Sequence, residues 1–179
     1  VLEGMGFTAV DCDALYYELL RTDQALRGKL REAFGDVFLP DGQLDRQQLG
    51  RLVFGDKKAL DKLNAIVFPT VTAAVREKIS ICTGRGLVVD AINLMESGLG
   101  ALCGYTVAVI APAEVRVRRI MERDGISEDY ARSRVAAQKN DSYYRRHCTL
   151  VLENRAKSRG EFEELIREFF ADLLDALDG

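Results

Sequence analysis

The chain has 179 residues, which suits one domain or one domain with an inserted lobe. Apolar residues make up 47% and charged residues 30%, so a sizeable core and an ordinary polar surface can coexist. The net charge of −3 argues against a general nucleic-acid binder, and no apolar run approaches the roughly 20 residues that cross a bilayer.

The cysteine and histidine content limits the metal and redox chemistry. The four cysteines are scattered without a C-x-x-C pair, which favours buried thiols in a reducing cytoplasm over disulfides or a zinc site. His147 is the single histidine, so a histidine-rich metal centre is excluded. We therefore expect a cytoplasmic protein without membrane or nucleic-acid partners, either monomeric or weakly oligomeric.

Four short, valine-rich runs predict buried strands, at residues 8–10, 86–90, 106–111 and 149–153. They do not alternate with polar residues, as is typical of strands covered on both faces in a parallel sheet. Helical patterns separate them along the chain. The sequence therefore predicts an α/β protein with a three-layer parallel sheet and flanking helices.

Residues 22–82 form a long helical stretch between the first two predicted strands. Thr22 or Asp23 can cap the first helix, Asp45 follows the Asp-Gly turn as the next cap, and Pro69 is expected to open a last helix that ends near Cys82. An insertion of this kind resembles a substrate-binding lobe more than a simple crossover. Residues 1–21 and 83–179 would then form the core.

Charge is unevenly distributed along the chain. Residues 116–146 hold nine Lys or Arg against five Asp or Glu, a balance of +4, whereas residues 161–179 have a balance of −6. A basic zone within an acidic protein indicates a site for a compact anion such as a phosphorylated metabolite. The acidic end also carries an apolar stripe at helical spacing, from Phe162 to Leu177, which predicts a helix docked on the sheet.

Two carboxylates, Asp11 and Asp13, follow the first predicted strand. Ligands of open α/β sheets bind beyond the carboxyl ends of the strands, where both residues would lie. Asp13 could cap the helix that begins at Ala14. Alternatively, one of the two could orient or deprotonate a hydroxyl, or hold Mg²⁺ through water.

The basic zone predicts two helical segments with arginines on their flanks. In residues 116–125, Arg116, Arg119 and Arg123 share one sector beside the apolar face, where they could reach a ligand or simply cover apolar surface. In the following segment Ser127 can cap a helix with Tyr130 and Val135 in its core. The polar residues after this cap could form a phosphate-binding lid or be ordinary exposed side chains. They are Arg132, Arg134, Gln138, Arg145 and Arg146.

Five segments, in order, resemble the dephospho-CoA kinase family. They are VDCDALYYELL (10–20), DGQLDRQQLGRLVF (41–54), DAINLMESGL (90–99), RIMERDGISEDYARSRVAAQ (119–138) and LVLEN (150–154). The resemblance covers nearly the whole chain. It implies a P-loop nucleoside-monophosphate-kinase-like fold and transfer of the γ-phosphoryl of Mg·ATP to the ribose 3′-hydroxyl of dephospho-CoA, the final step of coenzyme A synthesis.

The resemblance also assigns roles to individual residues. It implies that Asp13 orients or deprotonates the acceptor hydroxyl and that Arg134 acts in catalysis from a lid at about residues 125–147. Residues 22–82 would surround dephospho-CoA. The residues that bind dephospho-CoA would include Asp11, Phe68, Leu94 and Glu96. The ATP and lid residues would be Arg119, Arg123, Gln138, Arg145 and Asn154, with no direct metal ligand.

Two departures from the family pattern bear on these roles. Phe68 stands where the family has His, which removes a possible hydrogen-bond donor. The family's phosphate loop, G-x-x-x-x-G-K-[ST], does not occur in the 179 residues. By register this loop and the central first strand would lie upstream of Val1, so we expect a truncated sequence rather than a protein that never had them.

Two other functions fit the same residues. One is a different nucleotide or small-molecule kinase of the same fold, and the other is a non-catalytic CoA-binding remnant. We expect the codons immediately upstream of Val1 to encode, in frame, a short apolar strand followed by G-x-x-x-x-G-K-[ST]. Sequencing that DNA tests the expectation, and a stop codon without the motif would favour the remnant.

Overall fold

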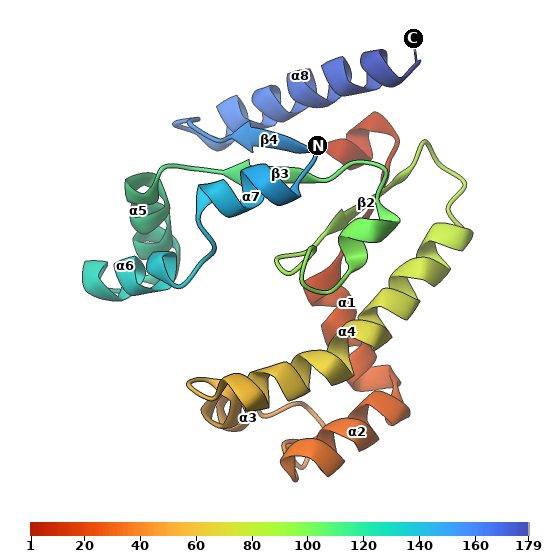
Figure 1. Ribbon diagram of the computed structural model, residues 1–179, viewed down its shortest axis with the longest axis vertical. Coiled ribbons are helices and arrows are strands. Elements are labelled where there is room, and N and C mark those ends of the chain that lie inside the picture. The colour runs from red at the N-terminus through yellow and green to blue at the C-terminus, as the bar shows by residue number, and fades with distance from the viewer. Residues whose placement is uncertain (179) are drawn as a thin grey trace. The chain divides into compact units, whose positions relative to one another are not determined.

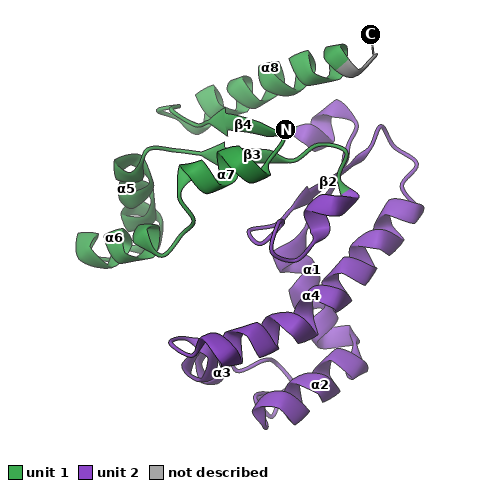
Figure 2. Cartoon of the chain, viewed as in Figure 1, with its two compact units in different colours: residues 1, 103–179 green, residues 2–102 purple. Residues whose placement is uncertain are grey.

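The computed structural model describes the backbone of residues 1–178 and the side chains of residues 1–176. The chain divides into two compact units, one formed by residues 2–102 and the other by residues 103–179 together with Val1 (Figure 2). Each unit contains one pair of parallel strands. None of the helices in the described part of the chain is long and apolar enough to cross a membrane.

The unit of residues 2–102 combines one strand pair with four helices (Figure 1). Strand β1 (Thr8–Asp11) pairs in parallel with β2 (Leu87–Asp90), so that Val10 lies opposite Val89. This confirms the first two predicted strands. The remaining elements are η1 (Leu2–Met5), α1 (Cys12–Thr22), α2 (Gln24–Phe34), α3 (Arg46–Val53), α4 (Lys57–Ser80) and η2 (Leu99–Leu102).

Aspartates begin the helices of this unit. The side chain of Asp23 accepts a hydrogen bond from Leu26 N at the start of α2, and that of Asp45 accepts one from Gln48 N at the start of α3. Asp45 was predicted as a cap from the sequence, and Asp23 was one of two candidates, with Thr22, for the cap of α2. Each satisfies a backbone N–H that has no partner inside the helix, which fixes where the helix starts.

The prediction that Pro69 opens a separate helix is wrong, because α4 continues through it. Proline has no N–H for the carbonyl of Ala65 and its ring crowds the preceding turn, so a kink is expected at this place. Figure 1 shows that α4 bends near its middle. Packing of both halves of α4 against the core evidently outweighs the local cost of the proline.

Two apolar clusters hold this unit together. One lies among α1, α2, α3 and α4, and the other joins β1 and α1 to the second half of α4. The first consists of Leu20, Leu26, Leu30, Val37, Phe38, Leu49 and Val53. The second consists of Val10, Cys12, Leu15, Val71, Val75 and Leu99. Because α1 contributes to both clusters, its orientation is fixed along its whole length.

The second unit also contains a parallel strand pair, β3 (Val107–Ile110) and β4 (Leu150–Glu153), which confirms the last two predicted strands. Thr106 and Thr149 exchange backbone-to-hydroxyl hydrogen bonds of 3.2 and 2.9 Å at the entry of the pair. The helices of this unit are α5 (Ala113–Asp124), α6 (Glu128–Ala136), α7 (Asp141–His147) and α8 (Arg159–Asp178).

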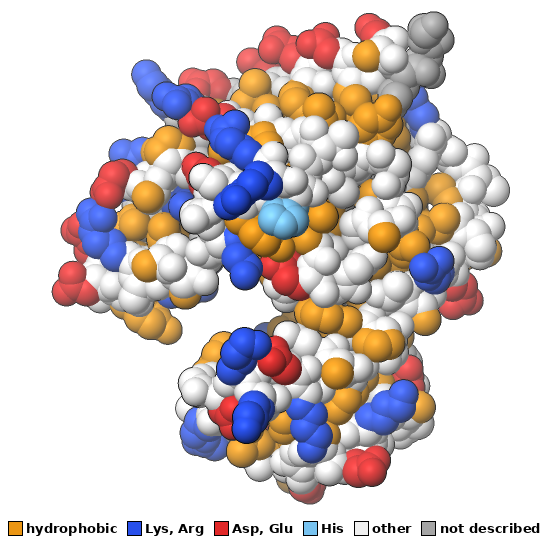
Figure 3. Space-filling model, viewed as in Figure 1, with side chains coloured by type: hydrophobic (Ala, Val, Ile, Leu, Met, Phe, Trp, Pro, Cys, Tyr) orange, Lys and Arg blue, Asp and Glu red, His pale blue; other side chains and the backbone are white. Residues whose placement is uncertain are grey.

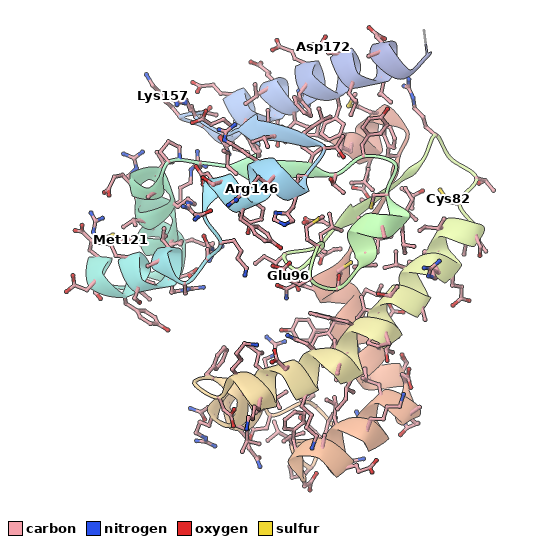
Figure 4. The ribbon with its side chains drawn as sticks, viewed as in Figure 1. Cys82, Glu96, Met121, Arg146, Lys157 and Asp172 are labelled. Atoms are coloured by element: carbon pink, nitrogen blue, oxygen red, sulfur yellow. The ribbon has the colours of Figure 1, made fainter. Side chains whose placement is uncertain are left out.

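Helices α5 and α6 pack through a small apolar core. Val117, Ala131 and Val135 are buried there, and Met121 packs against them from α5 (Figure 4). Tyr130 was expected in this core, but its side chain is 58% exposed. A nine-residue helix buries only a narrow face, and Ala131 with Val135 four residues later already occupy it.

The predicted C-terminal helix is confirmed as α8 (Figure 1). Phe162, Leu165, Ile166, Phe169 and Leu173 of the predicted stripe are partly buried. The side chain of Leu177, the last member of that stripe, lies outside the described residues.

Leu30→Ala should destabilise the fold, because Leu30 is fully buried. We expect a loss of about 3 kcal/mol in the free energy of unfolding. Leu52, which is 43% exposed, provides the matched control, and its replacement by Ala should cost less than about 1 kcal/mol. Urea denaturation of both variants measures the difference. Equal losses would contradict the assignment of the core.

Candidate active site

A pocket of about 250 Å³ opens in the unit of residues 2–102. Its walls come from the first two turns of α1, the middle of α4 and the loop after β2. The residues that line it are Cys12, Asp13, Tyr16, Tyr17, Leu63, Asn64, Val67, Phe68, Val71, Ala91, Ile92, Asn93, Ser97 and Leu99. The pocket thus begins at the carboxyl ends of the two parallel strands, the usual place for a ligand in an α/β protein.

The two aspartates at the end of β1 have different environments. Asp11 is the N-cap of α1, and its Oδ1 accepts hydrogen bonds from Asp13 N at 2.9 Å and Ala14 N at 3.0 Å. Asp13 is exposed in the first turn and lines the pocket. Its carboxylate has no hydrogen-bonding or ionic partner within residues 1–176. The cap is therefore Asp11, and the Asp13 carboxylate remains available to a ligand.

Two tyrosines extend the pocket wall beyond Asp13. Tyr16 and Tyr17 lie three and four residues later, so they share a helix face with Asp13. Burial, with a smaller contribution from Tyr17, raises the pKa of Tyr16 to about 12, so its hydroxyl stays protonated and can donate a hydrogen bond. The Arg46 guanidinium lies 4.0 Å from the centre of the Tyr17 ring, a cation–π contact that holds this ring in place.

The loop after β2 supplies part of the opposite wall. Asn93 and Ser97 line the pocket, and Phe68 contributes a ring from α4. Leu94, expected at the substrate, packs instead against the core cluster that contains Val10. Glu96 is exposed on the loop and is not among the residues that line the pocket (Figure 4).

Arg119 and Asn154 meet in the second unit. Arg119 Nη2 donates to Asn154 Oδ1 at 3.3 Å and to the Ala156 carbonyl at 2.8 Å. Asn154 directly follows β4 and is only 8% exposed, so this contact joins the flank of α5 to the end of the sheet. The sequence had placed both residues near one nucleotide, and they do lie together.

A second cluster forms around Asp124 at the end of α5. Arg123 contacts both carboxylate oxygens, through Nε at 2.6 Å and Nη2 at 3.0 Å, and Arg134 Nη1 contacts Oδ2 at 2.5 Å. The hydrogen bond from Arg123, followed by that from Arg134, lowers the pKa of Asp124 to about 2. The carboxylate is therefore charged at neutral pH. Sequence reasoning had selected the two arginines without the aspartate that joins them.

The other expected lid residues lie on α6, α7 and the turn between them. Gln138 Oε1 accepts a hydrogen bond from Arg116 Nη1 at 2.7 Å, which ties the end of α6 to α5. Arg145 and Arg146 are exposed on α7 next to His147 (Figure 4). Figure 3 shows basic side chains gathered over α7 beside the histidine, and acidic side chains along α8. The second unit thus offers several cations to an anionic ligand.

Sequence reasoning missed Tyr16, Tyr17 and Asn64 as pocket residues and Asp124 as a partner of two arginines. The tyrosines could have been found from their spacing of three and four residues after Asp13. Asn64 could have been found in the same way, because it lies four residues before Phe68 on α4. Asp124 was not selected, although an acid next to Arg123 at the end of a helix indicates an ion pair.

The side chains near Asp13 suit an Mg²⁺ ion that is held mainly by substrate phosphates and water rather than by several protein ligands. No group of three or more His, Cys, Asp or Glu side chains in the described residues could hold a metal ion. Mg²⁺ commonly binds through one or two carboxylates together with substrate phosphates and water. Asp13, whose oxygens have no partner in the described residues, fits such a site.

Comparison with known proteins gives consistent matches. A family model described as dephospho-CoA kinase matches residues 1–159. The dephospho-CoA kinase of Moorella thermoacetica is 32% identical over 184 residues, covering 96% of this chain and 87% of the relative. The Thermus thermophilus protein TT1252, whose crystal structure is solved, matches with a TM-score of 0.77 and 32% identity over 97% of this chain and 87% of its own.

Some relatives are much longer than this chain. The dephospho-CoA kinase of Mycobacterium bovis is 38% identical over 164 residues, which is 90% of this chain and 39% of the relative. The chain therefore spans about two fifths of the length of the mycobacterial relatives it matches.

Asp11→Ala and Asp13→Ala should differ in stability, because only Asp11 caps α1. Loss of the cap should cost about 1 kcal/mol of unfolding free energy. Asp13→Ala should cost less than about 0.5 kcal/mol, the size of a first-turn charge interacting with the helix dipole. Urea denaturation of both variants tests this, and a larger loss for Asp13→Ala would contradict the assignment of the cap.

Proposed function

We propose that this chain, which belongs to the dephospho-CoA kinase family, serves ATP-dependent phosphorylation of the ribose 3′-hydroxyl of dephospho-CoA, the final step of coenzyme A biosynthesis. The observation that carries the proposal is the carboxylate of Asp13, which faces the pocket without a partner in the described residues. Its position at a strand end, beside aromatic and amide side chains, suits an acceptor with a hydroxyl and a flat heterocycle.

The pocket chemistry supports an acceptor of this class. Tyr16, Tyr17 and Phe68 offer aromatic surface on which a purine ring can stack. Asn64 and Asn93 offer amides that both donate and accept hydrogen bonds, which suits ring nitrogens or the amides of a pantetheine arm. A pocket of about 250 Å³ holds only part of dephospho-CoA, so the remainder would extend over the surface.

Asp13 is proposed to orient the 3′-hydroxyl and to accept its proton as the oxygen attacks the γ-phosphorus. Phosphoryl transfer depends mainly on positioning and on neutralising charge, so a single carboxylate on the acceptor side suffices. Asp11 would support this role indirectly, because its cap fixes the backbone N–H groups of the turn that carries Asp13.

The second unit is proposed to bind ATP. Arg119, Arg123 and Asn154 would contact the nucleotide, and Arg134 and Arg145 would neutralise phosphate charge from a lid at about residues 125–147. Gln138 would stabilise this lid through its hydrogen bond to Arg116. Arginine suits this task because its planar fork can donate two parallel hydrogen bonds to a phosphate.

Mg²⁺ is proposed to arrive with ATP, and when bound it supplies charge neutralisation on the phosphate oxygens. Asp13, with Asp11 nearby on the same turn, would hold it through water. Residues 22–82 are proposed to act as the acceptor lobe and residues 1–21 with 83–179 as the nucleotide-binding core, in a cytoplasmic enzyme that is monomeric or weakly oligomeric.

Asp13→Asn in the full-length protein should lower kcat with dephospho-CoA and Mg·ATP by about 100-fold or more, because the amide cannot accept the proton. The fold should survive, because the Asp13 carboxylate has no partner in the described residues. Coupled measurement of ADP release gives kcat, and thermal unfolding gives the stability. Full activity in Asp13→Asn would refute the proposed role.

Acceptor specificity separates the remaining functions. The wild-type protein should phosphorylate dephospho-CoA far faster than any nucleoside monophosphate. Equal or faster turnover of a monophosphate would identify a different kinase of the same fold. Binding of dephospho-CoA without turnover of any acceptor would identify a non-catalytic CoA-binding protein.

A further inference from the structure

One carboxylate joins two arginines from different helices at the turn between α5 and α6. Asp124 is the last residue of α5, and Gly125, with φ of 63°, ends the helix there. Arg123 precedes Asp124 in sequence, whereas Arg134 reaches it from the last turn of α6. These three side chains carry a combined charge of +1, which is accessible because the Asp124 side chain is 25% and the Arg134 side chain 43% exposed.

The position of this carboxylate is unfavourable for the helix alone. The carboxyl end of a helix carries partial negative charge, so an acid in the last turn is repelled. The two guanidinium groups act against this repulsion, because the hydrogen bond from Arg123, followed by that from Arg134, lowers the pKa of Asp124. A charged aspartate is therefore maintained here by its arginines.

The two arginines are held in different ways. Arg123 uses Nε and Nη2 on Asp124, so two of its nitrogens are fixed by the carboxylate. Arg134 uses Nη1 alone, and its remaining N–H groups have no partner among residues 1–176. A guanidinium is planar and rigid, so fixing one nitrogen restricts the directions in which the others can donate.

We propose that Asp124 is a positioning residue for Arg134, fixing one side of its guanidinium so that the other side can meet the transferred phosphoryl group. The inference rests on the proposed function, in which Arg134 contacts phosphate. Pre-orientation of this kind stabilises the transition state because the arginine needs no reorganisation as charge develops on the phosphoryl oxygens.

The alternative is that Asp124 merely fastens α6 to α5, and the protein contains a matched control for that role. Arg132 of α6 contacts Glu114 of α5 through two hydrogen bonds of 2.8 Å, also between a carboxylate and a guanidinium. Glu114 lies outside the proposed site, and Arg132, although it lies within the lid, is assigned no contact with phosphate. If both pairs only hold α6 against α5, removing either carboxylate should change kcat by the same factor.

The experiment compares Asp124→Asn with Glu114→Gln in the full-length protein, using dephospho-CoA and Mg·ATP. We expect Asp124→Asn to lower kcat about tenfold, the scale of one charge-assisted hydrogen bond. KM for ATP should stay equal or fall, because losing a negative charge beside the arginines does not weaken their attraction for phosphate. Glu114→Gln should keep kcat within about twofold. Asp124→Glu, which keeps the charge, should recover most of kcat.

Arg134→Ala completes the test as a double-mutant cycle. In the Arg134→Ala background, Asp124→Asn should lower kcat much less than it does in the wild-type protein, because only the contact of Asp124 with Arg123 then remains to be lost. A loss of kcat in Arg134→Ala but not in Asp124→Asn would overturn the inference and leave the proposed function intact. Unchanged kcat in Arg134→Ala would overturn both the inference and the proposed role of Arg134. Equal effects of Asp124→Asn and Glu114→Gln, or of Asp124→Asn and Asp124→Glu, would also overturn it.

Discussion

The junction between β1 and α1 depends on the carboxylate of Asp11, which accepts two backbone hydrogen bonds from the first turn of the helix. Four N–H groups at a helix start have no partner within the helix, and a capping side chain decides which residue is the first in the helix. The position of this first residue in turn sets how α1 is rotated about its axis. Asp13 consequently faces the pocket and Leu15 faces the core, while Cys12 is buried in the core and also lines the pocket.

Three aspartates of this chain show how identical side chains acquire different hydrogen-bonding partners in different surroundings. Asp11 is satisfied by backbone N–H groups, and Asp124 is satisfied by two guanidinium groups. Asp13 has neither kind of partner in the described residues, although it lies only two positions after Asp11. Among these three aspartates, Asp13 therefore keeps both carboxylate oxygens open to a ligand.

Local features of the fold could be predicted from the sequence, whereas features that depend on distant packing could not. The strands were predicted because continuous valine-rich runs are characteristic of buried parallel strands, and Asp23 and Asp45 were predicted because capping is a short-range interaction. The continuation of α4 through Pro69 was missed, since it results from packing of both halves against apolar clusters far away in sequence. In the site, Asp13 and Phe68 were selected from the family resemblance and do line one pocket. Asn64 was not selected, although it lies four residues before Phe68 on the same helix.

The difference between local and distant interactions also explains why the sequence predicted the site arginines but not which residues they contact. A helical wheel places Arg119 and Arg123 on the flank of α5 without any tertiary information. Their contacts differ. Arg119 donates to a carbonyl and to the buried Asn154 at the end of β4, whereas Arg123 donates to its own neighbour Asp124. The first contact anchors α5 to the sheet and is partly buried. The second contact is exposed, where an ion pair contributes little to stability. An exposed carboxylate that binds two arginines therefore has more influence on where those arginines point than on whether the protein folds.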